Sequence, residues 1–190
     1  EMNKLDLIIG SGGVLSHAPR RSQAMMMMID AFQPHGTTMI AVDSIFMMPH
    51  LGVLSTINET AATEVFEKDC LIYLGPCISL TNTGKHGSKC LDYVITYSNG
   101  NIIEDSLLLG ELKVLDLKNG EKAEVAITPA RQFDVGEGNG KKIVKEVTGG
   151  VVGLVIDARG RPLDLKGGKG REPLAEVLSK WNMAFDAYPE

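Results

Sequence analysis

Three Asn-Gly dipeptides divide the second half of this 190-residue chain into short apolar runs, at residues 99–100, 119–120 and 139–140. A type I′ turn needs two residues that tolerate positive φ, so Asn-Gly between apolar runs predicts a β-hairpin. We predict one hairpin around the first dipeptide and a second around 119–120, in which residues 115–117 pair with the run that ends at Val125. Short strands at this spacing are typical of an antiparallel barrel or a sandwich.

The first 66 residues follow a different pattern, in which apolar strands alternate with helical segments. Residues 5–9 and 37–43 are predicted strands, and residues 20–31 and 56–65 have helical spacing. Alternating strands and helices predict an α/β unit with a parallel pair of strands. In the first of these helices we place Pro19 in the first turn, and we expect a run of four methionines to be buried on most sides.

The expected fold class is therefore α+β, with an α/β segment at 1–66 and a β-rich domain with a C-terminal helix at 67–190. The predicted β-strands of the second part are residues 71–74, 91–97, 102–109, 112–117, 123–127, 143–147 and 151–156. The C-terminal helix is predicted at 171–188, with one apolar stripe that would dock on the domain, namely Leu174, Val177, Leu178 and Trp181. The glycine- and lysine-rich residues 166–170 look the most flexible.

Composition excludes several classes of function. The net charge is −5 and aromatic residues make up only 5%, which gives neither an electrostatic footprint nor stacking platforms for nucleic acid. No stretch is apolar and long enough to predict a membrane span, and no secretory signal opens the chain. The three cysteines, Cys70, Cys77 and Cys90, have no zinc-type spacing, so we expect free buried thiols in a cytoplasmic protein. The four histidines are scattered, and no metal site is expected.

The sharpest local motif is the glycine-rich turn after the first predicted strand, formed by Gly10, Ser11, Gly12 and Gly13. Glycines allow a backbone to approach a ligand closely, and exposed N–H groups suit an anion or a ring edge. The motif is neither a P-loop nor a dinucleotide fingerprint, because it lacks Gly-Lys-Ser/Thr and a third glycine at the required position. On the residues alone, a ligand-binding turn and a plain strand-to-helix turn both remain open.

Two other groups of polar residues also leave alternatives open. Asp43 and Ser44 end a predicted strand, where they would either face a ligand or cap a short helix. The arginines Arg131, Arg159 and Arg161 would either bind an acidic partner or an anion, or form surface salt bridges.

Several runs of the sequence resemble known protein families. Residues 8–16, Ile-Ile-Gly-Ser-Gly-Gly-Val-Leu-Ser, resemble the adenosine motif of the actin, Hsp70 and sugar-kinase ATPases. Residues 8–55 and 129–163 are similar to the MutL or GlmL accessory proteins of glutamate mutase, whose name is unrelated to the mismatch-repair protein. Ser-His-Ala-Pro-Arg-Arg at 16–21 and Pro-Ala-Arg-Gln-Phe-Asp-Val-Gly at 129–136 are among the matching runs.

The resemblance implies a C-terminal fragment of a larger actin-like ATPase, and a start at Glu1 just before a strand fits such a piece. The parent would use ATP and Mg²⁺ to release damaged cobalamin from an amino-acid mutase, such as glutamate mutase or ornithine aminomutase. Residues 10–13 would contact the adenosine. The chain lacks the Asp-x-Gly-Thr phosphate hairpin of that group, so we expect no tightly bound nucleotide and no catalytic residue in the fragment itself.

Two further readings come from other functional classes. The chain could be a non-catalytic interaction module that docks on the mutase without binding nucleotide. A small independent enzyme is the least favoured reading. The sequence leaves the identity of the mutase and the oligomeric state open.

Overall fold

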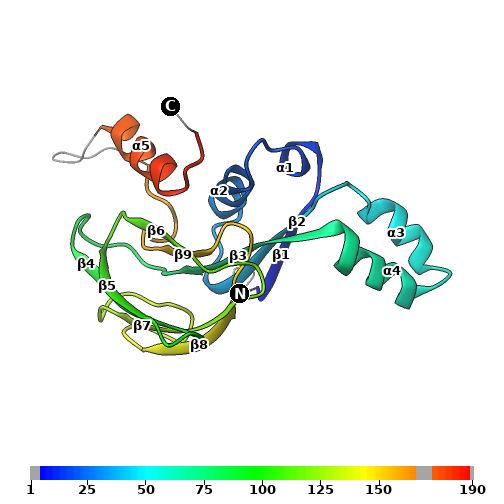
Figure 1. Cartoon of the computed structure of the whole chain (residues 1–190). Coiled ribbons are helices and arrows are strands. Elements are labelled where there is room, and N and C mark those ends of the chain that lie inside the picture. Colours follow the sequence, from blue (N-terminus) through cyan, green and yellow to red (C-terminus); the bar gives the residue numbers. More distant parts are fainter. Residues whose placement is uncertain (1–4, 166–172, 189–190) are drawn as a thin grey trace.

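The computed structural model describes residues 5–165 and 173–188, which are arranged in three layers (Figure 1). The middle layer is a five-stranded sheet, sheet one, with the order β1 (Leu7–Gly10), β2 (Gly36–Asp43), β3 (Leu71–Ser79), β9 (Leu154–Asp157) and β6 (Leu112–Leu115). Sheet two has the order β5 (Ile102–Leu108), β4 (Lys89–Tyr97), β7 (Lys122–Pro129) and β8 (Ile143–Thr148). The third layer consists of helices.

The helices belong to two groups. On one face of sheet one lie α1 (Gly13–Ser16), α2 (Arg21–Phe32) and α5 (Leu174–Ala184). A helical hairpin projects away from the sheets and consists of α3 (Met48–Ser55), α4 (Glu59–Val65) and a π-helical turn, η1 (Phe66–Cys70). Among the described residues, none of the helices combines the length and apolar character needed to cross a bilayer.

Sheet one contains the predicted parallel pair, because β1 runs parallel to β2. Strand β3 then pairs antiparallel with β2, and β9 lies between β3 and β6. The sheet therefore runs across the expected boundary at residues 66–67. A division of the chain into two units at that point stays a prediction.

The first predicted hairpin is confirmed, and the second is wrong. Strands β4 and β5 pair antiparallel around Asn99-Gly100, where Gly100 has φ +85° but Asn99 does not share this positive φ, so the pairing is as predicted and the type I′ turn is not. Asn119-Gly120 also forms a turn, since Glu121 N donates to Lys118 O at 2.9 Å. However, β6 pairs with β9 in sheet one, whereas β7 pairs with β4 and β8 in sheet two. The turn chemistry fixes the chain reversal, but the partner of each strand is decided by the core.

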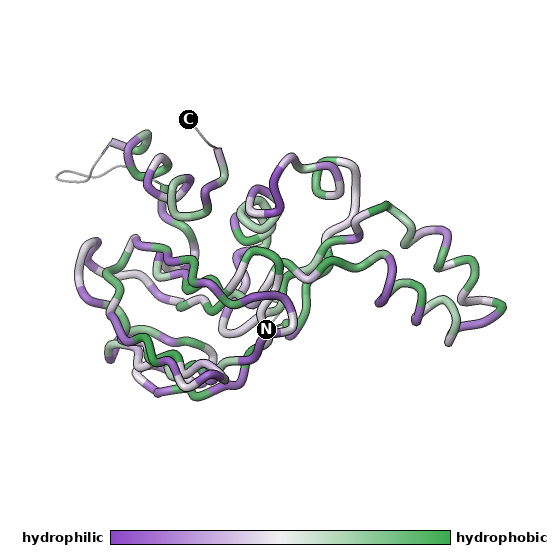
Figure 2. Tube along the Cα trace, in the orientation of Figure 1, coloured by the Kyte–Doolittle hydropathy of each residue, from purple (hydrophilic) through white to green (hydrophobic). Residues whose placement is uncertain are grey.

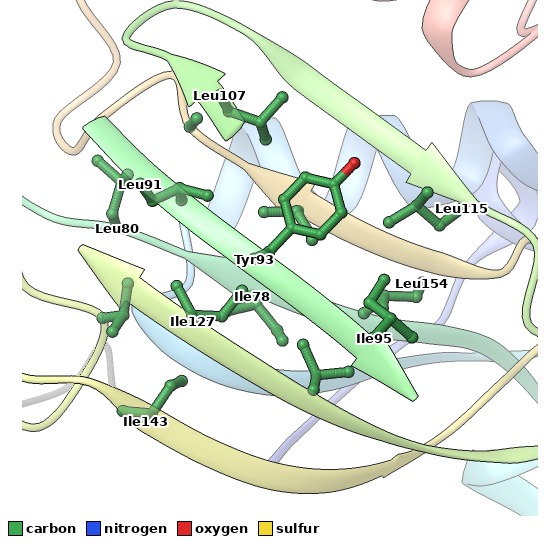
Figure 3. Close-up of a cluster of buried hydrophobic side chains, with 14 of the residues drawn as sticks. Ile78, Leu80, Leu91, Tyr93, Ile95, Leu107, Leu115, Ile127, Ile143 and Leu154 are labelled. Atoms are coloured by element: carbon green, nitrogen blue, oxygen red, sulfur yellow. The ribbon is translucent and has the colours of Figure 1, made fainter. Parts of the chain in front are cut away.

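The β-rich part is a sandwich, which resolves the alternative between barrel and sandwich. Its core lies between sheet two and the strands β3, β9 and β6 of sheet one (Figure 3). Tyr93 at the centre is fully buried, with Ile78 and Leu154 from the facing sheet in the same cluster. Strand β7 alternates exposed and buried residues along its length, as a strand with one face on a core should.

A second core joins the other face of sheet one to the helices. Met25 and Met28 of α2 are buried there, and their two methionine neighbours are half-buried, as predicted. The helix begins at Arg21 with Arg20 as N-cap, so Pro19 precedes its first turn and the prediction for Pro19 is wrong.

The C-terminal helix is confirmed, but its apolar stripe docks only in part. Trp181 is buried in the second core, whereas Leu174 and Leu178 stay exposed. The helix passes over the edge strand β6, and of the predicted stripe Val177 and Trp181 pack in the second core. The predicted flexible stretch, residues 166–170, lies outside the described residues.

Candidate functional site: the glycine-rich turn and the Asp43 loop

The glycine-rich turn leaves sheet one beside the loop that follows β2. Strands β1 and β2 are parallel and in register, with Gly10 opposite Val42, so both chains leave the sheet at the same edge. Open α/β sheets bind ligands at the carboxyl ends of such strands. The fold therefore brings the predicted turn next to Asp43, which sequence analysis had placed at a strand end.

The four predicted residues have different environments. Gly10 is buried, and a Cβ there would lie 2.3 Å from Met28 Sδ, so close packing by α2 explains this glycine. Ser11 and Gly13 are exposed, and Gly12 has φ +119° with nothing within 4 Å of the position that a Cβ would take. The accessible part of the turn is thus residues 11–13, and it lies open to solvent. A role in ligand binding for these residues stays a prediction.

Hydrogen bonds to Asp43 connect the glycine-rich turn with the loop that follows β2. Its carboxylate accepts hydrogen bonds from Ser11 Oγ at 3.1 Å, Met47 N at 3.1 Å and Met48 N at 2.9 Å. Its backbone oxygen accepts a bond from Ser16 Oγ at 2.6 Å. The two amide contacts hold the turn that leads into α3, but the N-cap of this helix is Met47 and no side chain caps it, so the predicted capping role of Asp43 is wrong. Ser44 does not cap, because its hydroxyl donates to Cys70 O at 2.8 Å.

These contacts also control the charge of Asp43. Burial by itself would raise the pKa of the carboxyl group. Hydrogen bonds from the backbone amides of Met48 and Met47 and from the Ser11 hydroxyl outweigh burial, and the pKa falls below its usual value. Asp43 is therefore a carboxylate at neutral pH, and it holds the glycine-rich turn against the base of the helical hairpin.

We expect Asp43→Ala to lower the free energy of unfolding by about 2 kcal/mol, because it leaves the amides of Met47 and Met48 without their acceptor. Ser11→Ala is the matched control, because it removes only the bond from an exposed hydroxyl and should cost less than about 1 kcal/mol. Urea unfolding followed by circular dichroism measures both values. Equal effects of the two substitutions would show that the amide contacts do not hold this loop.

Exposed apolar side chains follow both the glycine-rich turn and Asp43 in the chain, and no sequence pattern predicted their exposure. Val14 of α1 and Ile45 are well exposed, and Phe46 is 48% exposed with φ +57°. A bulky residue rarely adopts positive φ, and such strain persists only where the surroundings impose it. Here the bonds of Asp43 to the next two amides hold the turn. Bare glycine backbone beside exposed apolar side chains is a surface that suits a flat ring.

Arg159 and Arg161 form neither surface salt bridges nor an open anion site, so both alternatives for this pair are wrong. They are buried around Asp157, which Arg159 Nη2 contacts at 2.8 Å and Arg161 Nη2 at 2.6 Å. Arg159 also pairs with Asp30 of α2 at 2.8 Å and lies 4.6 Å from the centre of the Trp181 ring. The group joins β9, α2 and α5. Arg131 is exposed, and its predicted role stays a prediction.

Burial also sets the chemistry of the three cysteines. Cys70, Cys77 and Cys90 are free and buried, as predicted. Burial raises the pKa of Cys77 and of Cys90 to about 12, so both thiols are protonated at neutral pH. Within the described parts of the chain, no three histidine, cysteine or acidic residues lie close enough together to hold a metal ion.

The segment that contains this site is similar to a known protein family. Residues 1–70 match the family model described as MutL protein, which confirms the predicted resemblance over that part of the chain. The matched segment contains the glycine-rich turn, the Asp43 loop and the helical hairpin. No curated protein and no solved structure matches the chain. The resemblance predicted for residues 129–163 stays a prediction.

Proposed function

We propose that this chain, similar to MutL proteins over its first 70 residues, is the C-terminal part of a cytoplasmic actin-like ATPase that reactivates a cobalamin-dependent amino-acid mutase. The partner is a mutase of the glutamate mutase or ornithine aminomutase type. The complete protein binds ATP with Mg²⁺, and residues 10–13 contact the adenosine. A nucleotide-driven domain movement then opens the mutase, so that damaged cobalamin leaves.

The observation that carries the proposal is the open glycine-rich turn within the matched segment. Ser11 and Gly13 face solvent at the carboxyl ends of two parallel strands, and the bond from Ser11 to Asp43 keeps the turn in place. A purine can approach such a backbone because there are no side chains at residues 12 and 13. Phe46 and Val14 beside the turn add the apolar contact that a ring needs.

The free edge of β1 supports a continuation of the sheet. Among the described strands β1 pairs only with β2, and its sequence Leu-Ile-Ile-Gly has no charge or proline. Natural sheets protect exposed edges with charged residues or proline, which this strand lacks. Leu5 and Leu7 are also exposed here. A further strand of the complete protein would cover this edge and bring phosphate-binding elements to the other side of the glycine-rich turn.

Gly13→Val in the complete protein tests the nucleotide role. A Cβ at residue 13 would meet nothing closer than His17 Cδ2 at 4.0 Å, so the chain should tolerate the change. If adenosine lies against this turn, we expect the affinity for ADP with Mg²⁺ to fall at least about tenfold, because a branched side chain occupies the position of the ring. Isothermal titration calorimetry measures the affinity.

Gly52→Val is the matched control, because a Cβ at residue 52 also has nothing within 4 Å and this glycine lies in the projecting hairpin. It should leave ADP affinity unchanged. Unaltered ADP binding by Gly13→Val would remove residues 10–13 from the site. A complete protein that binds no nucleotide but is retained by immobilised mutase would instead favour the interaction module. Failure to bind either would contradict both readings.

A further inference from the structure

The three Asn-Gly dipeptides are all exposed, but the fold holds them in different ways. They lie in surface loops at 99–100, 119–120 and 139–140. Asn-Gly is the dipeptide in which asparagine deamidates most readily, because glycine has no side chain to hinder attack by its own backbone nitrogen. The chain thus carries three copies of one reactive group, and the contacts of each copy decide how readily it reacts.

The dipeptide at 99–100 is held at both of its reacting groups. Gly100 N donates a hydrogen bond to Tyr97 O at 2.9 Å, and Asn99 Oδ1 accepts one from Asn101 N at 2.9 Å. Deamidation needs a free glycine amide and an asparagine side chain that can rotate toward it. An amide that stays hydrogen-bonded in the fold reacts only after local opening, as it does in hydrogen exchange.

The dipeptide at 139–140 is held in the same two places. Gly140 N donates to Phe133 O at 2.8 Å, and Asn139 Oδ1 accepts a bond from Asn82 Nδ2 at 3.1 Å. Asn82 lies far away in the sequence, so this bond fastens the loop to another part of the fold. Reaction at Asn139 therefore requires both hydrogen bonds to open.

The dipeptide at 119–120 has neither restraint in full. Gly120 N has a long bond to Gly149 O, at 3.3 Å, which lies outside the usual range of N–H···O bonds. The side chain of Asn119 makes no hydrogen bond to the residues that the structure describes. Both residues are exposed, and the hydrophilic colouring of the loop between β6 and β7 in Figure 2 agrees with contact with water. The nucleophile and the side chain are thus both available.

We propose that Asn119 is a site of spontaneous deamidation. The nitrogen of Gly120 loses its proton and attacks Asn119 Cγ, so that a new C–N bond forms. The bond from Cγ to the side-chain nitrogen breaks, and that nitrogen leaves as ammonia. Water then opens the resulting five-membered succinimide at either carbonyl, which gives aspartate or isoaspartate. The inference goes beyond the proposed function, because the reaction needs only water and involves neither nucleotide nor mutase.

The product differs from the original loop in charge and in backbone length. Each event adds one negative charge to a loop that already carries Asp116 and Glu121. The isoaspartate form also adds one CH₂ group to the backbone of the turn that the bond from Glu121 N to Lys118 O closes at 2.9 Å. This loop connects β6 of sheet one with β7 of sheet two. Molecules that have been modified therefore differ in charge and in the geometry of this connection.

Incubation of the full chain in a mildly alkaline buffer tests the inference. Peptide mapping by mass spectrometry follows the deamidated fraction at each dipeptide with time. In the folded protein the rate at Asn119 should exceed the rates at Asn99 and Asn139 at least about tenfold, because hydrogen bonds must open first at the other two sites. In concentrated urea the three rates should become similar, because the dipeptides then have no structural restraint.

Two variants test the assigned cause. Asn119→Gln should remove most of the acidic form that isoelectric focusing detects, because glutamine would have to form a less favourable six-membered ring. Asn82→Gly removes the side chain that holds Asn139, and glycine suits the φ of +78° at residue 82. It should accelerate deamidation at Asn139 at least about threefold and leave the rate at Asn119 unchanged.

Melting curves verify that each variant is folded. Equal rates at the three dipeptides of the folded protein would overturn the proposal, and so would an equally large difference in urea. An acidic form that persists in Asn119→Gln, or an unchanged rate at Asn139 in Asn82→Gly, would also contradict it.

Discussion

Asp157→Asn should lower the free energy of unfolding by about 3–5 kcal/mol, because it removes the charge that two buried guanidinium groups share. Asp157 is 0% exposed, and its carboxylate accepts bonds from Arg159 Nε at 2.9 Å and Nη2 at 2.8 Å. Arg161 Nη2 donates a third bond at 2.6 Å. Asparagine has nearly the same shape, so the loss would report the charge and its hydrogen bonds.

The same substitution should loosen the docking of α5. Arg159 lies between the acidic groups and the ring of Trp181, the single tryptophan of the chain. If the guanidinium group of Arg159 moves into solvent, Trp181 loses the cation that lies against its ring. We therefore expect a red shift of tryptophan fluorescence in folded Asp157→Asn, in addition to the loss of stability.

The pH dependence follows from the same contacts. Burial alone would raise the pKa of Asp157, but the charges of Arg159 and Arg161 and their hydrogen bonds hold it well below its usual value. An acid with a depressed pKa in the folded state stabilises the fold above its unfolded pKa, near pH 4. That contribution is lost progressively as the pH falls below about 4, and Asp157→Asn should lack this part of the acid dependence.

An exposed ion pair is the control for Asp157. Lys122 Nζ lies 2.7 Å from Glu146 Oε1, and both side chains are well exposed. Glu146→Gln should cost less than about 1 kcal/mol. Urea unfolding at neutral pH measures both variants. A loss for Asp157→Asn as small as that for Glu146→Gln would show that the buried pairs contribute little.

Gly75→Ala is the second substitution with a large expected effect, a loss of about 3 kcal/mol or more, which would leave much of the protein unfolded. Gly75 has φ +141°, and a Cβ there would lie 1.9 Å from the backbone oxygen of Gly153. A backbone atom cannot turn aside as a side chain can. The residue lies where the pairing of β2 with β3 shifts register, between Ile40 and Ala41.

Gly52→Ala is the matched control for a methyl group added to a glycine. It lies inside α3 with open space around it, and alanine should stabilise the helix by about 0.5–1 kcal/mol. Thermal unfolding should thus shift in opposite directions for the two variants. A folded Gly75→Ala protein with an unchanged melting temperature would contradict the close approach of β3 to residue 153.

The positions of most elements could be predicted from the sequence because local signals determine them, but β3 runs on to Ser79 beyond the predicted 71–74, and α3 was not predicted. Alternation and turn residues located every strand of sheet two, and the Asn99-Gly100 hairpin formed as predicted. The pairing of β6 could not be predicted in this way. Leu112 and Leu115 are buried, and an apolar strand fits either sheet, so only the three-dimensional core decides that β9, not β7, is the partner of β6.

The candidate site shows the same division between local and long-range information. The glycines at 10–13 and the place of Asp43 at the end of a strand could be predicted, because each depends on neighbouring residues. The exposure of Phe46 and the burial of Arg159 depend on segments far away in the sequence. The alternating residues Asp157, Arg159 and Arg161 were the available signal for a buried charge cluster, but a single sequence does not show which charges lose contact with water.

The place of β9 in sheet one has a consequence for biosynthesis. This strand joins β3 to β6, although both are made well before it. Between translation of residue 115 and residue 154, β3 lacks a partner on one edge and β6 has no partner strand at all. Such edges recruit strands from other polypeptides. Ribosomes that stall in this interval would therefore release chains that are prone to aggregate. Chaperones that bind nascent chains would be needed most while these residues are translated.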